Sequence, residues 1–316
     1  MRCTLKLLAY LTEKMIKQVM KSFAEFLISE SNPIRYVLTD IDDTLTINGR
    51  LPSVAFVAME KLQAAGIAVI PITGRPAGWC DHIARMWPVD GVVGENGAFY
   101  FRYNGGIRKM IRRYWKLEKE RCTDRKRLDA IQRQVLKSVP GARVASDQAY
   151  READLAIDFC EDVAPLTSVD IDLIVACFTE AGAQAKISSI HVNGWFGDYD
   201  KLAMTRLLFE EVFSEDINAI REQVIYVGDS PNDAPMFGFF PNSVGVANVK
   251  NFTGIMPHDP AWVTEREGGF GFAEMASGLL HHSDSLDRCA IPNRTGRKNS
   301  QRFLPGILEQ CQYRNP

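Results

Sequence analysis

The sequence lacks paired cysteines. Its seven cysteines are odd in number and scattered, and none forms a Cys-x-x-Cys pair. This distribution indicates neither a zinc site nor a disulfide framework. Thiols without such partners are typical of proteins in a reducing compartment, so we expect a cytoplasmic location.

Long apolar runs are also absent. No stretch approaches the roughly 18 apolar residues that cross a bilayer. Residues 5–11 are apolar apart from Lys6, and Lys14 and Lys17 follow soon after them. A secretory signal would have a longer apolar region and a cleavage site of small residues. We therefore expect no membrane partner.

Neither sign of charge is in large excess, because 37 basic and 39 acidic residues give a net charge of −2. This balance offers no general case for binding nucleic acid or an anionic membrane. The most basic segment, residues 108–127, also contains three acidic residues and only two aromatic ones. That mixture favours a solvated protein surface over a nucleic-acid site. The sequence does not indicate an oligomeric state.

Short apolar runs alternate with helical patterns over much of the chain. This alternation predicts an α/β fold, with a Rossmann-like parallel sheet covered on both faces by helices. The expected strands are residues 36–39, 67–72, 92–93, 98–101, 224–227 and 243–246, and the expected helices are residues 53–65, 76–86 and 202–213.

The length exceeds what one compact core usually uses, so we expect more than one domain. The texture changes near residue 104, which predicts an inserted α+β domain over residues 104–190 within a core formed by residues 34–103 and 191–281. Residues 1–33 have the spacing of an amphipathic helix, with a membrane-surface helix as the alternative. The polar residues 282–316 are expected to form a mobile tail or, alternatively, a docking peptide.

Three carboxylates follow the apolar run at residues 36–39, namely Asp40, Asp42 and Asp43. Such a concentration of negative charge is unfavourable unless a cation or a phosphate reaction needs it. Two other predicted strands also end in polar residues, at Thr73 and Asp229. Since ligands bind at the carboxyl ends of parallel strands, we expect these ends to meet in one crevice.

The residue types at this crevice suit phosphate-ester hydrolysis. Asp40 would attack phosphorus to form an aspartyl-phosphate, and Asp42 would protonate the leaving oxygen and then activate water. Asp40, Asp229 and the backbone carbonyl of Asp42 would bind Mg²⁺, with Asp233 holding this site in place or adding a ligand.

A phosphate would bind at three further positions. Thr73 and Gly74 offer a hydroxyl and a backbone N–H just before a helix, and Lys201 would neutralise the transferred group. Each feature alone has an ordinary interpretation: an acidic calcium-type loop, a helix start, a surface lysine. Their occurrence together and in order favours the catalytic interpretation.

These segments resemble the four motifs of the haloacid dehalogenase superfamily: Asp40-Ile41-Asp42-Asp43-Thr44-Leu45, Thr73-Gly74, Lys201 and Gly228-Asp229-Ser230-Pro231-Asn232-Asp233. Only about 30 residues separate the first two motifs. The long interval between the second and third is similar to the large α/β cap of one branch, which includes sucrose-phosphate, trehalose-phosphate and mannosyl-phosphoglycerate phosphatases and phosphomannomutases. The family usually has glycine where this chain has Asp43.

The resemblance implies a Mg²⁺-dependent phosphomonoester hydrolase that acts on a small phosphorylated metabolite, with a sugar phosphate favoured. It suggests that Arg75 and Asn96 face the substrate, and Asn232 is a further candidate. His191 and Asn193 are near the second crossing between cap and core and are candidates to contact a sugar, with a strand residue at a polar edge as the equal alternative for His191. Dehalogenases of the family lack the second aspartate and its ion pumps have lysine there, so Asp42 argues against both. A phosphosugar mutase and a catalytically idle binding module remain as alternatives.

Overall fold

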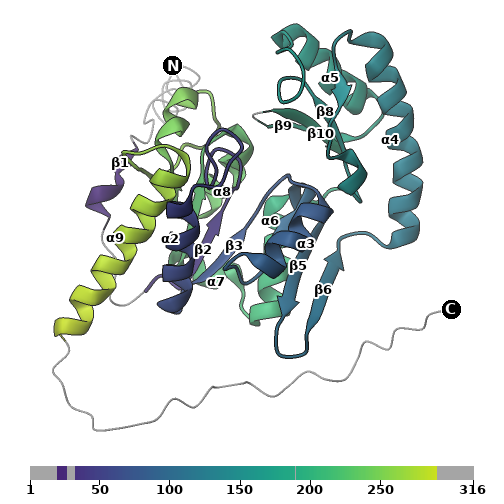
Figure 1. Cartoon of the computed structure of the whole chain (residues 1–316). Helices are drawn as coiled ribbons and strands as arrows, with labels where there is room; N and C mark the ends of the chain where they lie inside the picture. The colour runs from purple at the N-terminus through teal and green to yellow at the C-terminus, as the bar shows by residue number, and fades with distance from the viewer. Residues whose placement is uncertain (1–19, 27–32, 189, 290–316) are drawn as a thin grey trace, which may run out of the picture.

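A six-stranded parallel sheet forms the centre of the structure, a computed structural model that describes residues 20–26, 33–188 and 190–289 (Figure 1). All five strand pairs are parallel. The spatial order is β1 (Lys21–Ser22), β13 (Trp262–Val263), β12 (Asn242–Gly245), β11 (Val224–Gly228), β2 (Tyr36–Thr39) and β3 (Ala68–Pro71).

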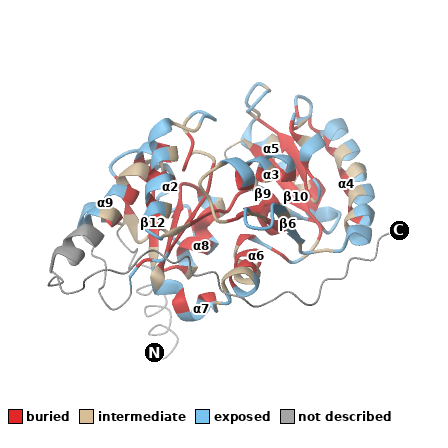
Figure 2. Cartoon of the chain, turned by 60° about the horizontal axis from the view of Figure 1, so that its bottom comes forward, coloured by how far each residue is buried: buried red, intermediate tan, exposed pale blue. Residues whose placement is uncertain are grey.

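Helices cover both faces of this sheet, as the unbroken apolar strands require. Successive residues of β2 belong to opposite layers: Val37 packs with α2 (Ser53–Ala64), α3 (Ala77–Met86) and α9 (Gly268–Cys289). Leu38 packs with α6 (Lys201–Leu208), its π-helical continuation Phe209–Phe213, and α8 (Ala234–Phe239). Figure 2 shows the strands buried and the outer faces of α2 and α9 exposed.

A small antiparallel sheet continues the core beyond β3. It consists of β4 (Val92–Gly94), β5 (Phe99–Asn104) and β6 (Lys109–Tyr114). A parallel bridge between Ile72 and Val93 connects it to the central sheet. The short segments Ile217–Ile220 (α7), Arg221–Gln223, Ala247–Phe252 and Phe23–Glu25 complete the core.

A separate antiparallel sheet lies in the chain between β6 and α6. Its order is β7 (Arg143–Val144), β8 (Leu155–Asp158), β10 (His191–Trp195) and β9 (Gln184–Ile187). Helices α4 (Glu118–Ser138) and α5 (Ser168–Glu180) pack on it around a core of their own, which includes Leu128, Ile157 and Phe178 (Figure 1). We call this unit, residues 117–195, the cap.

The cap begins and ends later than the predicted boundaries at residues 104 and 190. Strand β6 pairs with β5 in the core, so residues 104–114 do not belong to the cap sheet. Residues 185–192 form part of a hairpin, in which β9 and β10 pair antiparallel. The predicted boundary at residue 191 therefore falls at the first residue of a cap strand.

The structure also corrects the predictions at the ends of the chain. Residues 1–19 and 27–32 of the expected amphipathic helix lie outside the described residues. Within residues 20–26 the chain is not α-helical, because Lys21–Ser22 pairs with Trp262–Val263 at the sheet edge. Residues 282–289, expected in the tail, continue helix α9, and residues 290–316 are outside the description. None of the described helices has the length and apolar character needed to cross a membrane.

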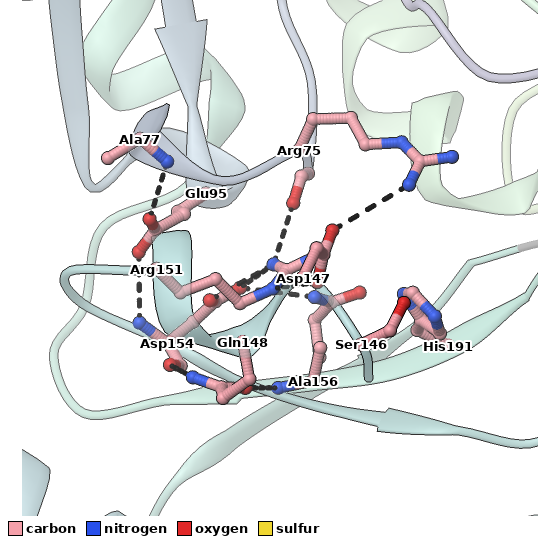
Figure 3. Close-up of polar contacts among 12 residues, drawn as sticks. Arg75, Ala77, Glu95, Ser146, Asp147, Gln148, Arg151, Asp154, Ala156 and His191 are labelled. Atoms are coloured by element: carbon pink, nitrogen blue, oxygen red, sulfur yellow. Dashed lines mark hydrogen bonds and ion pairs between the residues drawn. The ribbon is translucent and has the colours of Figure 1, made fainter. Parts of the chain in front are cut away.

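A buried carboxylate fastens the cap to the core. Glu95 is fully buried, and its Oε1 accepts hydrogen bonds from the backbone N–H groups of Ala77 at 3.0 Å and Glu152 at 2.9 Å. Its Oε2 accepts from the N–H groups of Ala153 at 2.6 Å and Asp154 at 3.1 Å. Figure 3 shows Glu95 between the core residue Ala77 and the cap residue Asp154. One core side chain thus satisfies three backbone donors of the cap.

We expect Glu95→Gln to destabilise the protein by at least about 2 kcal/mol, because the amide NH₂ would face two buried N–H donors. Urea unfolding would measure this loss, with the exposed Glu60→Gln as the control. A change no larger than that of the control would contradict the fastening role.

The pH dependence of this effect has a definite sign. Burial, and then the nearby Asp154, raise the pKa of Glu95 from 4.5 to about 7, although Arg151 and the N–H groups oppose the shift. A carboxyl with a raised pKa binds more protons in the folded state, so its contribution to stability falls as pH rises from about 4.5 to about 7. We expect the advantage of the wild type over Glu95→Gln to shrink between pH 5 and pH 8. An advantage that grew over this range would be inconsistent with the raised pKa.

Candidate active site

Two carboxylates lie side by side at the carboxyl end of the central sheet. Asp40 directly follows β2, and Asp229 directly follows the neighbouring strand β11. The backbone N–H of Asp40 donates to the carbonyl of Val227, which holds the two strand ends in register. Both aspartates are buried, so the structure brings together two predicted residues that are 189 positions apart in the sequence.

Lys201 places a positive charge beside the proposed nucleophile. It is the first residue of α6, which the Asp200 side chain caps, and its Nζ donates to Asp40 Oδ1 at 2.8 Å and to Asp233 Oδ1 at 2.9 Å. These carboxylates raise the pKa of Lys201 even though burial opposes the shift. A Cβ on Gly97 would lie 2.1 Å from the Asp200 carbonyl oxygen, so only glycine permits this approach of α6.

Both side-chain oxygens of Asp233 accept hydrogen bonds from neighbouring residues. Besides Lys201, Tyr226 donates its hydroxyl to Oδ1 at 2.6 Å. The N–H groups of Asp229 and Ser230 donate to Oδ2 at 3.1 and 3.4 Å. These contacts fit the predicted role of Asp233 in orienting Lys201 and Asp229 better than a direct bond to a metal.

In the part of the chain that the structure describes, the Asp229 side chain is hydrogen-bonded to neutral groups. Among the described residues its side chain accepts hydrogen bonds from Thr44 Oγ1 at 3.2 Å and Asn248 Nδ2 at 3.1 Å. Burial, then Asp233 and Asp40, raise its pKa well above the usual value. Oxygen atoms of Asp40, Asp229 and Asp233 lie within 4.8 Å of one another. Lys201 lies beside Asp40 and Asp233 but not beside Asp229, and a buried hard oxygen donor of this kind suits Mg²⁺.

Asp40, the predicted nucleophile, also lacks sufficient compensating positive charge. Burial raises the pKa of Asp40 to about 7, with Asp233 and Asp42 adding to the shift and Lys201 opposing it. A bound divalent cation would favour the ionised form that attacks phosphorus.

Asp43 adopts a backbone conformation that glycine favours, with φ of 55°. Asp and Asn are the non-glycine residues that most readily adopt this left-handed region. The backbone conformation therefore accounts for the usual glycine of the family motif and for its replacement by aspartate here.

Asp42 is paired with Arg75, which was predicted from the sequence to face the substrate. Arg75 Nε lies 3.0 Å from both Asp42 oxygens, and its Nη2 donates to Oδ1 at 2.8 Å. Arg75 also lies 3.7 Å from Asp147 and 3.5 Å from Glu161, both in the cap. Despite burial, Asp42 and these other carboxylates raise the pKa of Arg75. The guanidinium therefore connects the proposed acid–base residue to the cap.

A small closed cavity of about 20 Å³ lies between the core and the cap. Its lining includes Asp40, Asp42, the cap residue Arg151 and Gly74, which was predicted to bind phosphate. It also includes the residues that were predicted to face the substrate: Arg75, Asn96, His191, Asn193 and Asn232. Thr73 is outside this lining, and its Oγ1 accepts a hydrogen bond from the Arg75 N–H at 3.0 Å.

The cap residues His191 and Asn193 at the cavity each lie against another residue of the cap. His191 Nε2 lies 2.9 Å from Glu161 Oε2, and Asn193 Nδ2 donates to Asp154 at 3.1 Å. Asn96 is a core residue whose buried Nδ2 has no hydrogen-bond partner in the described part of the chain, and His191 Nε2 also makes no hydrogen bond there, although it lies close to Glu161. A ligand oxygen in the cavity would satisfy the Asn96 donor.

Several residues that build the site were missed by the sequence reasoning. Arg151 is buried between Asp147 and Asp154 and also donates to the Gly74 carbonyl at 3.0 Å. Glu161 and Asn248 were missed as well, because nothing in their local sequence marks them. Glu95 was also missed, although the sequence offered a signal for it, because it directly precedes Asn96, which was predicted to face the substrate.

Comparisons with known proteins agree with this geometry. Residues 37–116 match the family model of haloacid dehalogenase-like hydrolases. A crystal structure of a Thermoplasma acidophilum protein is 18% identical, with a TM-score of 0.60 over 78% of this chain and 99% of the other. The fold is thereby settled.

The chain has the haloacid dehalogenase fold.

Other structures with this fold include enzymes acting on sugar phosphates. The sucrose-phosphatase of Synechocystis sp. PCC6803, solved with sucrose and phosphate, is 14% identical with a TM-score of 0.55, over 78% of this chain and 98% of the other. A sugar phosphatase of HAD subclass IIB is 13% identical with a TM-score of 0.52, over 79% and 99%. No curated protein sequence matches the chain. The family resemblance and the α/β fold with an inserted cap are thus confirmed.

We expect Mg²⁺ to stabilise the folded protein, because it would compensate the buried charges of Asp40 and Asp229. At about 100 times its dissociation constant, the ion would raise the free energy of unfolding by about 2.7 kcal/mol. Urea unfolding with and without Mg²⁺ measures this. Asp229→Asn should lose most of the increase, and Asp172→Asn, an exposed change on α5, should retain it. Equal stabilisation of both variants would place the ion elsewhere.

Proposed function

We propose that the protein is a Mg²⁺-dependent phosphomonoesterase that acts through an aspartyl-phosphate on Asp40. The observation that carries this proposal is the arrangement around Asp40: Lys201 lies 2.8 Å from one oxygen, Asp229 approaches from the end of β11, and Asp42 lies two residues further along the loop that follows β2. This arrangement combines a nucleophile, a fixed positive charge, a cation site and an acid–base group.

The reaction would proceed in two balanced steps. An Asp40 oxygen forms a bond to phosphorus while the bond to the leaving oxygen breaks, and Asp42 gives its proton to that oxygen. A water molecule then attacks phosphorus, Asp42 takes its proton, and Asp40 is released with inorganic phosphate. When bound, Mg²⁺ would neutralise charge on the phosphoryl oxygens, with Asp40, Asp229 and the Asp42 carbonyl as its ligands.

The ion pair with Arg75 bears on both steps. In the structure the Arg75 guanidinium holds both Asp42 oxygens. In the first step Asp42 must carry a proton, so the ion pair has to loosen when substrate binds. Arg75 also contacts cap residues, which couples this loosening to movement of the cap.

We further propose a small phosphorylated metabolite as substrate, with a sugar phosphate favoured. The polar cap residues at the cavity, including Ser188, His191 and Asn193, suit sugar hydroxyls. The solved sucrose-phosphatase and sugar phosphatase of the same fold support this choice. Since about 20 Å³ admits roughly one water, the cap must open to admit substrate and then exclude solvent again. The cytoplasmic location and the absence of a nucleic-acid partner stay predictions.

A phosphosugar mutase would use the same Asp40 and Asp42 but return the phosphoryl group to a sugar. Measuring inorganic phosphate against isomerised sugar phosphate separates the two activities, and we expect phosphate to dominate.

We expect Asp40→Asn to lower the release of phosphate from a generic aryl phosphate by at least about 10³-fold, because an amide oxygen is a poor nucleophile. Circular dichroism should show an unchanged fold, since the two side chains have the same shape. Asp172→Asn is the matched control and should retain full activity. A variant that kept a tenth of the wild-type rate would exclude Asp40 as the nucleophile.

A further inference from the structure

A second hollow, of about 450 Å³, lies next to the catalytic cavity. It is formed by the loop that follows β2 and by helix α3, and the cap residue Tyr150 closes one side. Its walls are mainly apolar and aromatic, with Leu51, Trp79, Ile83 and Trp87 among them. Trp79 and Tyr150 are 42% and 58% exposed, so large ring surfaces face solvent here.

Asp42 and Arg75 line both the closed cavity and this hollow. The ion pair between them therefore forms the boundary that the two spaces share. The Asp42 side chain is 24% exposed, whereas that of Asp40 is 5% exposed. The acid–base residue is thus accessible from the outer hollow, while the nucleophile is enclosed.

The volumes of the cavity and the hollow, and the reach that a general acid needs, indicate what the hollow binds. A cavity of about 20 Å³ holds roughly one water molecule, so a leaving group that touches its polar lining extends beyond it. A general acid must lie within hydrogen-bond reach of the leaving oxygen. The leaving group therefore has to lie on a side that Asp42 can reach, and the hollow is such a side. Its volume falls within the range of roughly 300–1,000 Å³ that is common for small-molecule sites.

The cap completes this hollow when it rests on the core. A Cβ on Gly78 of α3 would lie 2.9 Å from the Tyr150 Cβ, so the two segments are in close contact. Arg151, next to Tyr150, donates to the Gly74 carbonyl at 3.0 Å. The ring of Tyr150 consequently becomes a wall only in the closed arrangement.

We propose that this hollow binds the leaving group of the substrate, and that this group carries a ring with an uncharged, apolar face. The inference rests on the proposed phosphatase function and adds a subsite to it. The aromatic walls supply stacking surface for a ring. Arg75 also lies 3.7 Å from Asp147 and 3.5 Å from Glu161, so its charge stays compensated when its pair with Asp42 loosens, and it is not free to hold a charged leaving group.

The test compares benzyl phosphate with ethyl phosphate, two alkyl esters that differ in the ring. The measured quantity is the ratio of kcat/KM for benzyl phosphate to that for ethyl phosphate. Tyr150→Ala removes one wall and should lower this ratio about tenfold. Leu51→Trp fills the hollow and should lower it at least as much. Met86→Ala removes an exposed side chain of α3 outside the hollow and should leave the ratio unchanged.

A binding measurement separates this inference from the proposed function. Benzylphosphonate should bind the Mg²⁺-loaded wild type about tenfold more tightly than ethylphosphonate in calorimetry, and Tyr150→Ala should remove the difference. Phosphate release with ratios and affinities that stay within twofold in both variants would overturn the hollow and leave the phosphatase standing. Preferential benzylphosphonate binding without Asp40-dependent turnover would support the hollow and overturn the phosphatase.

Discussion

The contact on which the site depends is the buried ion pair of Lys201 with Asp40 and Asp233. Without it, the ends of β2 and β11 would bring buried carboxylates together with no compensating charge. Such an arrangement is strongly unfavourable in a low dielectric. Lys201 compensates the charges of Asp40 and Asp233. Among the described residues Asp229 is hydrogen-bonded to neutral groups, so a bound cation would be needed to compensate its charge. The same contact that permits folding therefore prepares the chemistry.

A second charged network ties the cap to this centre. Arg75 connects Asp42 with Asp147 and Glu161, and Glu95 accepts three backbone N–H groups of the cap. The cap thus rests on polar contacts around the acid–base residue, beside a closed cavity and an open aromatic hollow. Polar contacts of this kind can be exchanged for substrate contacts, which an apolar interface would not allow. In the proposed mechanism, opening of the cap and release of Asp42 would be coupled through the same side chains.

Prediction from sequence succeeded where local pattern and topology act together. The strands at residues 36–39 and 224–227, and the helix at residues 53–65, were found because apolar periodicity is a local property. The proximity of Asp40 and Asp229 was predicted because the carboxyl ends of parallel strands lie at the same edge of a sheet. The cap boundaries were misplaced, because sheet membership of β6 and β10 depends on pairing partners distant in sequence. The strand at Lys21–Ser22 was missed for the same reason.

The sequence by itself determined the α/β class, the strand ends that carry the chemistry and the residue types needed for phosphoryl transfer, since these follow from hydrophobic period and local spacing. Only the tertiary structure decided which charges pair. Arg75 lies on Asp42, Lys201 bridges Asp40 and Asp233, and Glu161 and Arg151 enter from the cap. The energy of an ion pair depends on distance and burial, and both are set when segments far apart in the chain pack together.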